Sequence, residues 1–250
     1  MASKAVKIYL SPACHGIDHP CAWGHNCSEN THANMFMDEL IPYLAACGFE
    51  WKRNPANKRG STGVQNAVKE SNAWGADLHY VVHTNGSDGT VHSDRPMYWT
   101  KDKTGVGKAL CEVIANWRRQ IYPYSIIIKT KSNLYEMTHA KAPCVYEELI
   151  FHDNKDDAVW LHNNMRLCAE FTCRAFCQYY GVRFIDPYRL KGDVDNDGKI
   201  TSTDARLALQ ASVGKIELDD EAAYAADVDG DGKVTSTDAR IILQKATGKS

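Results

Sequence analysis

Two copies of one acidic motif carry the clearest chemical signal in this chain of 250 residues. The copies begin at Asp193 and Asp227, 34 residues apart, and each runs into the sequence Ser-Thr-Asp-Ala-Arg. Aspartates alternate with other residues in each copy, and carboxylates this close repel one another unless a cation neutralises them. The spacing fits loops of about 12 residues in which oxygen ligands surround one calcium ion. Gly198 and Gly232 stand where such a loop turns sharply. The motif therefore predicts two Ca²⁺ sites.

Each loop is expected to supply carboxylates, a threonine and one backbone carbonyl. The first set is Asp193, Asp195, Asp197, the Lys199 carbonyl, Thr201 and Asp204, and the second is Asp227, Asp229, Asp231, the Lys233 carbonyl, Thr235 and Asp238. Paired loops that end in Asp, where an EF-hand has Glu, resemble type I dockerins over about residues 190–250. The resemblance implies a calcium-dependent module that binds a cohesin domain, and the two near-identical copies raise the hypothesis of two binding orientations. The implied cohesin contacts are Ser202, Thr203, Ser236 and Thr237.

A second group of side chains lies near predicted strand ends in the first part of the chain. His15 follows the first strand, Glu29 stands at the entrance of the next helix, and His83 ends a later strand. Two imidazoles and one carboxylate leave the fourth tetrahedral position of a zinc ion open, which is the pattern of a catalytic site. The trio predicts one catalytic Zn²⁺ that makes a nucleophile of water, although manganese or cobalt suits the same ligands.

Such a site also needs a base that is not a metal ligand. The segment 143–154 is predicted to run along a strand that stops at two glutamates, Glu147 and Glu148. Because adjacent strand residues face opposite sides, only one of the two enters the site. The spacing alone does not choose between them.

The order of these segments resembles the zinc-dependent N-acetylmuramoyl-L-alanine amidases of the amidase 3 class, over about residues 5–183. The family pattern appears here as His15, Glu29, His83-Thr84-Asn85 and Glu148-Leu-Ile-Phe151-His-Asp-Asn154, although Cys14 replaces the glycine usual before the first histidine. The resemblance selects Glu148 as the catalytic base. It implies hydrolysis of the amide between N-acetylmuramic acid and L-alanine of peptidoglycan, with Glu148 passing a proton from water to the leaving amine.

Other histidines and cysteines allow alternatives. A structural zinc site is one reading of the segment between the first two ligands, although its spacings are irregular; its residues are Cys14, His19, Cys21, His25, Cys27 and His32. His79 is interpreted as a core histidine. His139 and His152 flank the Glu148 strand, and either is a candidate to orient substrate or stabilise the carbonyl oxyanion.

The elements that must position these residues alternate between strands and helices over residues 1–187. Strands are predicted at 6–10, 78–82, 125–128 and 143–146, and helices at 34–47, 106–117 and 155–180. This alternation predicts an α/β domain of three layers, with a mostly parallel central sheet, flanking helices and catalytic residues at strand ends. Residues 188–250 are expected to form a small all-α calcium-binding dockerin with two F-hand-like loops. Its two short helices, 204–213 and 238–246, are closed by Gly214 and Gly248.

The composition excludes several classes of partner. The net charge is −2, from 29 basic and 31 acidic residues, so neither nucleic acid nor a membrane surface is expected to bind. No apolar run approaches the roughly 20 residues of a membrane-spanning helix, and the N-terminus does not read as a signal peptide. The nine cysteines are expected to be reduced, since three of them lie in one helical stretch as small buried residues.

The leading functional hypothesis is a lytic amidase brought to the bacterial cell wall by dockerin–cohesin docking. A catalytic domain followed by a targeting module, without a leader, resembles phage or prophage endolysins, which pass through a holin pore. One alternative is a secreted wall-remodelling amidase of a cellulosome-bearing bacterium, with a leader not present here. Another is a catalytically silent domain attached to a cohesin-binding module.

Overall fold

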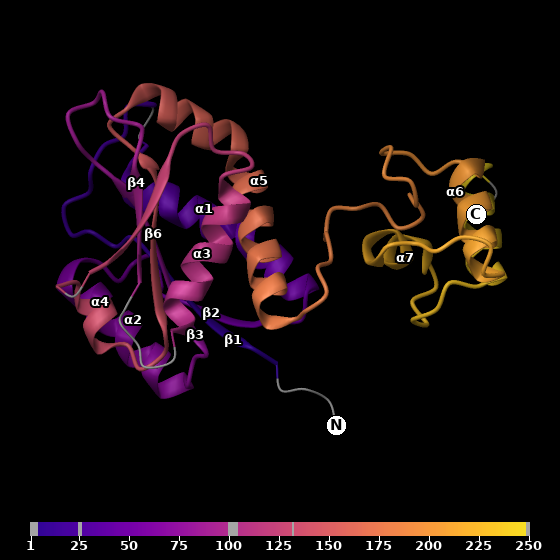
Figure 1. The fold of residues 1–250 in the computed structure, drawn as a ribbon, viewed down its shortest axis with the longest axis horizontal. Helices are drawn as coiled ribbons and strands as arrows, with labels where there is room; N and C mark the ends of the chain where they lie inside the picture. The colour runs from indigo at the N-terminus through magenta and orange to yellow at the C-terminus, as the bar shows by residue number, and fades with distance from the viewer. Residues whose placement is uncertain (1–4, 25–26, 100–104, 132, 249–250) are drawn as a thin grey trace. The chain divides into compact units, whose positions relative to one another are not determined.

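The computed structural model describes residues 5–24, 27–99, 105–131 and 133–248. The chain divides into two compact units, Met1–Val182 and Arg183–Ser250, which Figure 1 colours from indigo to orange and from orange to yellow. The first unit ends at Val182, whereas the sequence predicted a boundary after residue 187. No helix within the described ranges is both long and apolar enough to cross a membrane.

A six-stranded sheet forms the centre of the first unit. The strands lie in the order β2 (Glu50–Arg53), β1 (Lys7–Pro12), β3 (Leu78–Asn85), β6 (Cys144–Phe151), β4 (Arg95–Trp99) and β5 (Ile126–Thr130). Every neighbouring pair is parallel except β4 and β6. The central strands β1, β3 and β6 are buried along nearly their whole length, as expected when both faces of a parallel sheet are covered.

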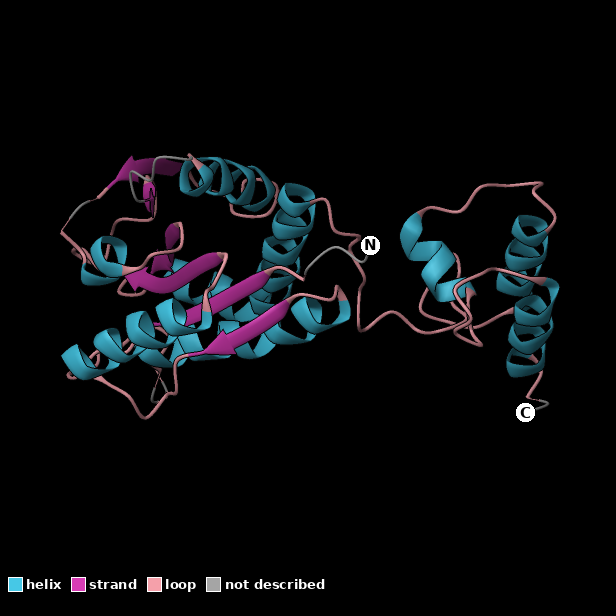
Figure 2. Ribbon diagram, turned by 90° about the horizontal axis from the view of Figure 1, so that it is seen from below, coloured by secondary structure: helices cyan, strands magenta, loops and turns pink. Residues whose placement is uncertain are grey.

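Helices cover both faces of the sheet, so the predicted three-layer α/β fold is confirmed. The helix α5 (Lys155–Tyr180) packs against both α1 (Glu29–Ala46) and α3 (Val106–Arg118) on one face. The helices α2 (Gly60–Trp74) and α4 (Tyr135–His139) pack together on the opposite face (Figures 1 and 2). This arrangement leaves the carboxyl ends of the parallel strands β1 and β3 beside the start of α1.

Several elements differ from their predicted bounds. The helix α1 begins at Glu29 and continues through Pro42. A proline costs a helix one hydrogen bond, and the buried side chains of Phe36, Leu40 and their neighbours hold this helix in place. The prediction that the glutamate strand stops at Glu148 is wrong, because β6 continues to Phe151, which pairs with Asn85 after a shift in register. The elements β2, β4 and α4 were not predicted.

The second unit contains three helices around a small core. They are α6 (Ser202–Ser212), α7 (Asp220–Ala226) and α8 (Ser236–Ala246), of which α7 was not predicted. The core consists of small apolar residues, and α6 packs closely against α8. Gly214 and Gly248 follow these two helices with φ of 69° and 65°, the left-handed conformation that ends helices.

Candidate active site and dockerin surface

His15, Glu29 and His83 come together at the carboxyl ends of β1 and β3. His15 Nε2 lies 3.1 Å from Glu29 Oε2, and His83 Nδ1 lies 2.8 Å from Glu29 Oε1. One carboxylate thus faces two imidazoles through different oxygens, and one ligand atom from each residue lies within 4.8 Å of the others. The donor set and its convergence fit a zinc ion with three protein ligands.

Electrostatics keep Glu29 ionised in this setting. Burial alone would raise the pKa of the Glu29 carboxyl, but the hydrogen bonds from His15 and His83 bring that pKa well below its usual range. The hydrogen bond to Glu29 in turn raises the pKa of His15. An ionised carboxylate beside two imidazoles is the state that a divalent metal needs.

The segment that carries His15 is fixed to the start of α1. The side chain of Asn30 accepts a hydrogen bond from His15 N at 2.9 Å and donates one to His15 O at 3.0 Å. Asp18 accepts hydrogen bonds from Asn30 N and from Ser28 Oγ, and Ser28 caps α1 by accepting from Thr31 N. These hydrogen bonds restrain the backbone of His15 and the start of α1. The His15 ring is thereby held close to Glu29, the first residue of α1.

Glu147 and Glu148 occupy opposite faces of β6. Glu147 is fully buried and lies 3.2 Å from both Arg95 Nη1 and Arg118 Nε. Tyr80 Oη donates a further hydrogen bond to it at 2.5 Å. Burial raises and the two guanidinium groups lower the pKa of Glu147, with a net decrease. Glu147 is therefore a structural counter-ion with no access to the pocket.

Glu148 lines the pocket beside the predicted zinc ligands. Burial raises the pKa of Glu148 to about 7, against the opposing effect of His83. Its Oε2 atom is buried and has no hydrogen-bond partner in the part of the chain that the structure describes. A carboxylate with a free buried oxygen and a pKa near neutrality suits proton transfer to and from a bound water.

The pocket extends along both sides of the two histidines. The hollow that contains Glu148 measures about 250 Å³ and is also lined by His19, Tyr146 and His152. His15 and His83 also line two further hollows of about 260 and 210 Å³, toward α2 and α4. Adjoining hollows around one centre provide room for an extended substrate.

His79, His139 and His152 lie in different surroundings. His79 is fully buried, lies 3.1 Å from Glu136 and stacks on Tyr9, as a core histidine does. His139 lies on α4 beside Tyr135 and is not among the pocket residues. His152 lines the pocket with its Nδ1 3.0 Å from Thr84 Oγ1, so it is the better placed of the two candidates to contact substrate.

Comparison with known families identifies the first unit. The sequence profile of the N-acetylmuramoyl-L-alanine amidases matches residues 8–176, more than half of the chain. The chain belongs to this family. The profile of the type I dockerin domain matches residues 191–245 of the same amidase, so both resemblances noted in the sequence are confirmed. A search of curated proteins gave no match.

Solved structures show the same amidase fold. The amidase AmiC2 of Nostoc punctiforme superimposes with a TM-score of 0.62 at 17% identity, over 72% of this chain and 99% of that one. The CwlD amidase of Clostridioides difficile, solved with the GerS lipoprotein, gives 0.62 at 15% identity over 70% and 98%. The catalytic domain of the CD27L endolysin, which targets Clostridia difficile, gives 0.55 at 16% identity over 69% and 97%.

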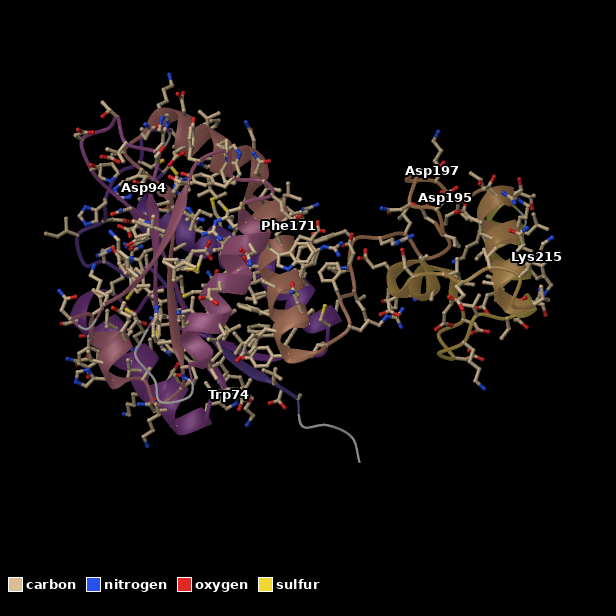
Figure 3. All side chains as sticks on the ribbon, viewed as in Figure 1. Trp74, Asp94, Phe171, Asp195, Asp197 and Lys215 are labelled. Atoms are coloured by element: carbon tan, nitrogen blue, oxygen red, sulfur yellow. The ribbon has the colours of Figure 1, made fainter. Side chains whose placement is uncertain are left out.

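Each acidic loop of the dockerin brings three of its six predicted ligands together. Carboxylate oxygens of Asp193, Asp195 and Asp197 converge in the first loop, and Figure 3 shows the last two as neighbours. In the second loop the converging carboxylates are those of Asp227, Asp229 and Asp238. The last aspartate of each loop also caps the following helix, since Asp204 and Asp238 accept hydrogen bonds from Thr201 and Thr235.

An apolar groove lies between α6 and α8 of the dockerin. It measures about 380 Å³ and is lined by Ser202, Ala205, Arg206, Leu209, Ser236, Ala239, Arg240 and Leu243. The last four residues are the first four displaced by 34 positions, so the groove has two equivalent halves. Leu209 and Leu243 are 48% and 45% exposed. Of the predicted cohesin contacts, the two serines line this groove and the two threonines do not.

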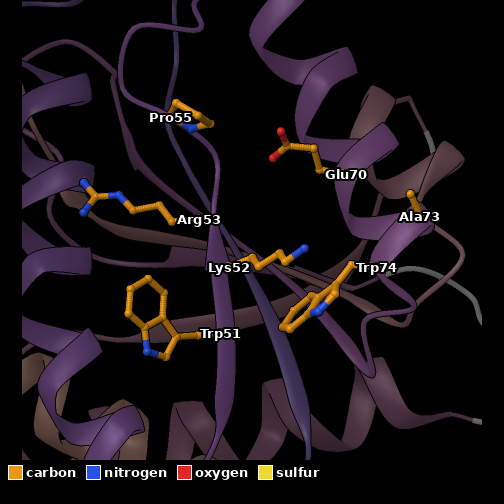
Figure 4. Close-up of a pocket in the computed structure, with 7 residues that line it drawn as sticks. All are labelled: Trp51, Lys52, Arg53, Pro55, Glu70, Ala73 and Trp74. Atoms are coloured by element: carbon orange, nitrogen blue, oxygen red, sulfur yellow. The ribbon is translucent and has the colours of Figure 1, made fainter.

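Another cavity, of about 540 Å³, lies away from the active site at the edge strand β2. Figure 4 shows its walls, which include Trp51, Lys52 and Glu70. Trp74 stands beneath the ammonium groups of Lys7 and Lys52, at 5.4 and 5.3 Å from its ring centre. No group of metal ligands lies there among the described residues, so this cavity does not compete with the histidine pocket as the catalytic centre.

Two residues that line the active site, Tyr146 and His19, were not predicted to do so from the sequence. Tyr146 stands two residues before Glu148, on the same face of β6, and stacks on the His83 ring at 4.6 Å between centres. The strand period alone would have found it. His19 also lines the pocket, but it comes from an irregular segment whose direction no periodic pattern predicts.

Proposed function

We propose that His15, Glu29 and His83 bind the catalytic zinc ion of this amidase and that Glu148 is its general base. A zinc ion held there supplies Lewis acidity toward water and toward the carbonyl oxygen of the scissile amide. The observation that supports the roles most directly is the free, buried oxygen of Glu148 beside the two imidazoles.

Within the pocket each side chain has a distinct task. Glu148 takes a proton from the attacking water and returns it to the nitrogen of the leaving L-alanine, so that the amine departs neutral. Tyr146 fixes the plane of the His83 ring by stacking. His152 lines the pocket, and Thr84 holds its Nδ1 atom. We assign it to contact with the substrate.

Peptidoglycan zymography with the full chain tests this proposal. Glu148→Ala should fail to clear the gel, because removal of a general base costs about 10²–10⁴-fold in rate. His139→Ala is the matched control and should clear as well as the wild type, since His139 lies on α4 outside the pocket. Digests by the wild type should contain new N-terminal alanine and intact glycan strands. If Glu148→Ala clears normally, Glu148 is not the general base. The silent-domain alternative gains support only if the wild type itself fails to clear the gel.

For the dockerin we propose that each acidic loop binds one Ca²⁺ and that the groove between α6 and α8 binds a cohesin domain. The supporting observation is the repetition of groove residues at 34-residue intervals, which makes the surface nearly the same after a half-turn. The groove thereby supports the hypothesis of two binding orientations. A double substitution of Ser202 and Thr203 should leave cohesin binding intact through Ser236 and Thr237, and complete loss of binding would refute it.

Cleavage of this amide bond is compatible with both biological roles considered from the sequence, a phage endolysin and a wall-remodelling enzyme bound to a scaffold. The apolar groove favours the scaffold setting, because such a surface is suited to another protein rather than to a glycan. Lysis of cells from outside, measured with and without a cohesin-bearing scaffold, distinguishes the two. A scaffold-bound enzyme gains activity on the wall with the scaffold, whereas an endolysin does not need it.

A further inference from the structure

Four metal-binding side chains converge in the amidase domain outside the active site. They are Cys21, Cys27, His32 and His162, and one ligand atom from each lies within 4.8 Å of all the others. This is not the set of six that the sequence suggested. His19 lines the active-site pocket, Cys14 lies outside the converging group, and His25 lies outside the described residues. The fourth member, His162, comes from α5.

The separations fit a tetrahedral metal site. Cys27 Sγ lies 2.9 Å from His32 Nε2 and 3.3 Å from His162 Nε2, the two Nε2 atoms are 2.9 Å apart, and Cys21 Sγ is 3.8 Å from His32 Nε2. A tetrahedral zinc ion holds sulfur and nitrogen ligands with edges of roughly 3.3–3.8 Å, given its bond lengths. Small movements of the side chains around a bound ion would bring all four donors to such distances.

The backbone holds the two cysteines at the ends of one closed loop. Cys21 N donates to Cys27 O at 3.0 Å, Gly24 N to Cys21 O at 3.3 Å and Cys27 N to Gly24 O at 3.1 Å. Gly24 has a φ of 86°, which favours glycine. The flanking residues Pro20 and Ser28 form an antiparallel bridge. These hydrogen bonds hold the backbones of Cys21 and Cys27 close together, so both thiols belong to the converging group without help from a metal.

The histidines come from two helices, and three of the four ligands are buried, while His162 is half-buried. His32 is fully buried in the first turn of α1, and both cysteines are 8% exposed. The Trp23 ring, from the cysteine loop, stacks on His162 at 4.5 Å between ring centres. Two thiols and two imidazoles complete a four-ligand shell with no position left for substrate, which is the character of a structural zinc site.

We propose that Cys21, Cys27, His32 and His162 bind one structural zinc ion that fastens the β1–α1 segment to α5. This segment carries His15 and His19 into the active site, and Ala22 N also donates to His152 O at 2.7 Å. The ion therefore secures one wall of the pocket. It is separate from the catalytic zinc, and its existence does not depend on the roles assigned to His15, Glu29 and His83.

Cobalt substitution of the full chain tests the site, because only thiolate ligands give a sulfur-to-cobalt charge-transfer band. The band is expected in the wild type and in Glu29→Ala, which alters the thiolate-free trio. It should vanish in Cys27→Ser, together with the loss of one zinc per chain in metal analysis. Cys111→Ser is the matched control, since Cys111 is also buried but lies outside the group, and it should keep both band and zinc.

His162→Gln provides a second variant for the case in which Cys27→Ser does not fold. It removes one ligand from the partly exposed face of α5 and should lower the zinc content by one per chain while the circular dichroism stays native. A wild type without the charge-transfer band overturns the proposal. So does an intact mass that shows a Cys21–Cys27 disulfide, or a band that depends on Cys47, which belongs to a separate group with Cys173 and Cys177.

Discussion

Substitution of the adjacent residues Glu147 and Glu148 by glutamine should separate stability from catalysis. Glutamine keeps the shape of the side chain and removes its charge. Glu147→Gln leaves the guanidinium groups of Arg95 and Arg118 buried without their shared counter-ion. Removing one partner from a buried ion pair costs about 3–5 kcal/mol, a large share of the roughly 5–15 kcal/mol that stabilises a typical domain. The melting temperature of the amidase domain should therefore fall by roughly 6–20 °C.

Glu148→Gln should have the opposite effect on the stability of chelator-treated protein. Burial raises the pKa of Glu148 from 4.5 to about 7, so the folded state disfavours the ionised form. The resulting penalty is absent below pH 4.5, grows as the pH rises, and reaches on the order of 3 kcal/mol above pH 7. Glutamine removes this penalty. The variant should melt no lower than the wild type at pH 8, although it lacks amidase activity.

Thermal unfolding followed by circular dichroism at pH 4 and pH 8, paired with zymography, measures both effects. The gain from Glu148→Gln should appear at pH 8 and disappear at pH 4. A Glu147→Gln variant that melts within a degree or two of the wild type would contradict this prediction, because the buried ion pairs would then contribute little. The prediction is also refuted if the two variants lose equal stability, because the two carboxylates would then not occupy opposite faces of β6.

Three further outcomes are expected. Calcium titration should increase the helicity of the dockerin, because the clustered carboxylates of each loop repel one another without a cation. The double variant Asp193→Ala/Asp227→Ala should show no such increase. A wild-type helicity that does not change with calcium would contradict the assignment of the two loops as Ca²⁺ sites. His83→Ala should lose activity and one zinc per chain while the cobalt–thiolate band remains, and retention of full zinc would remove His83 from the ligand set. Replacing Leu209 alone by Ser should preserve cohesin binding in a calorimetric titration, whereas replacing Leu209 and Leu243 together should abolish it; equal loss from the single change would exclude two equivalent orientations.

The convergence of carboxylates in the two acidic loops was predictable because all the residues concerned lie within one short stretch of sequence. A dozen residues contain every oxygen ligand proposed for each loop, so residue type and spacing were enough to predict the site, and the repeat at 34 residues doubles the signal. The three-layer fold was predictable for a related reason. Apolar runs and helical periods are local, and their alternation along the chain indicates an α/β sheet.

Tertiary structure alone decided which distant side chains meet. Glu29, His15 and His83 are brought within hydrogen-bond distance by parallel strands whose carboxyl ends share one edge of the sheet. Arg95 and Arg118 lie on one face of β6 and pair with Glu147. Because adjacent strand residues face opposite sides, Glu148 lies on the other face. Neither guanidinium was singled out in the sequence, since an isolated arginine carries no local pattern.

The Cys and His group shows the same division within a single site. The sequence by itself placed Cys21, Cys27 and His32 in a segment rich in metal ligands, but it also offered Cys14 and His19 as equals. Packing of α5 against α1 selected among them by bringing His162 to the cysteine loop. His162 lies 130 residues from His32, and no short-range spacing records a contact of that kind. Local patterns indicated which kinds of metal-ligating side chain this protein carries, and the fold decided which of the distant ones converge.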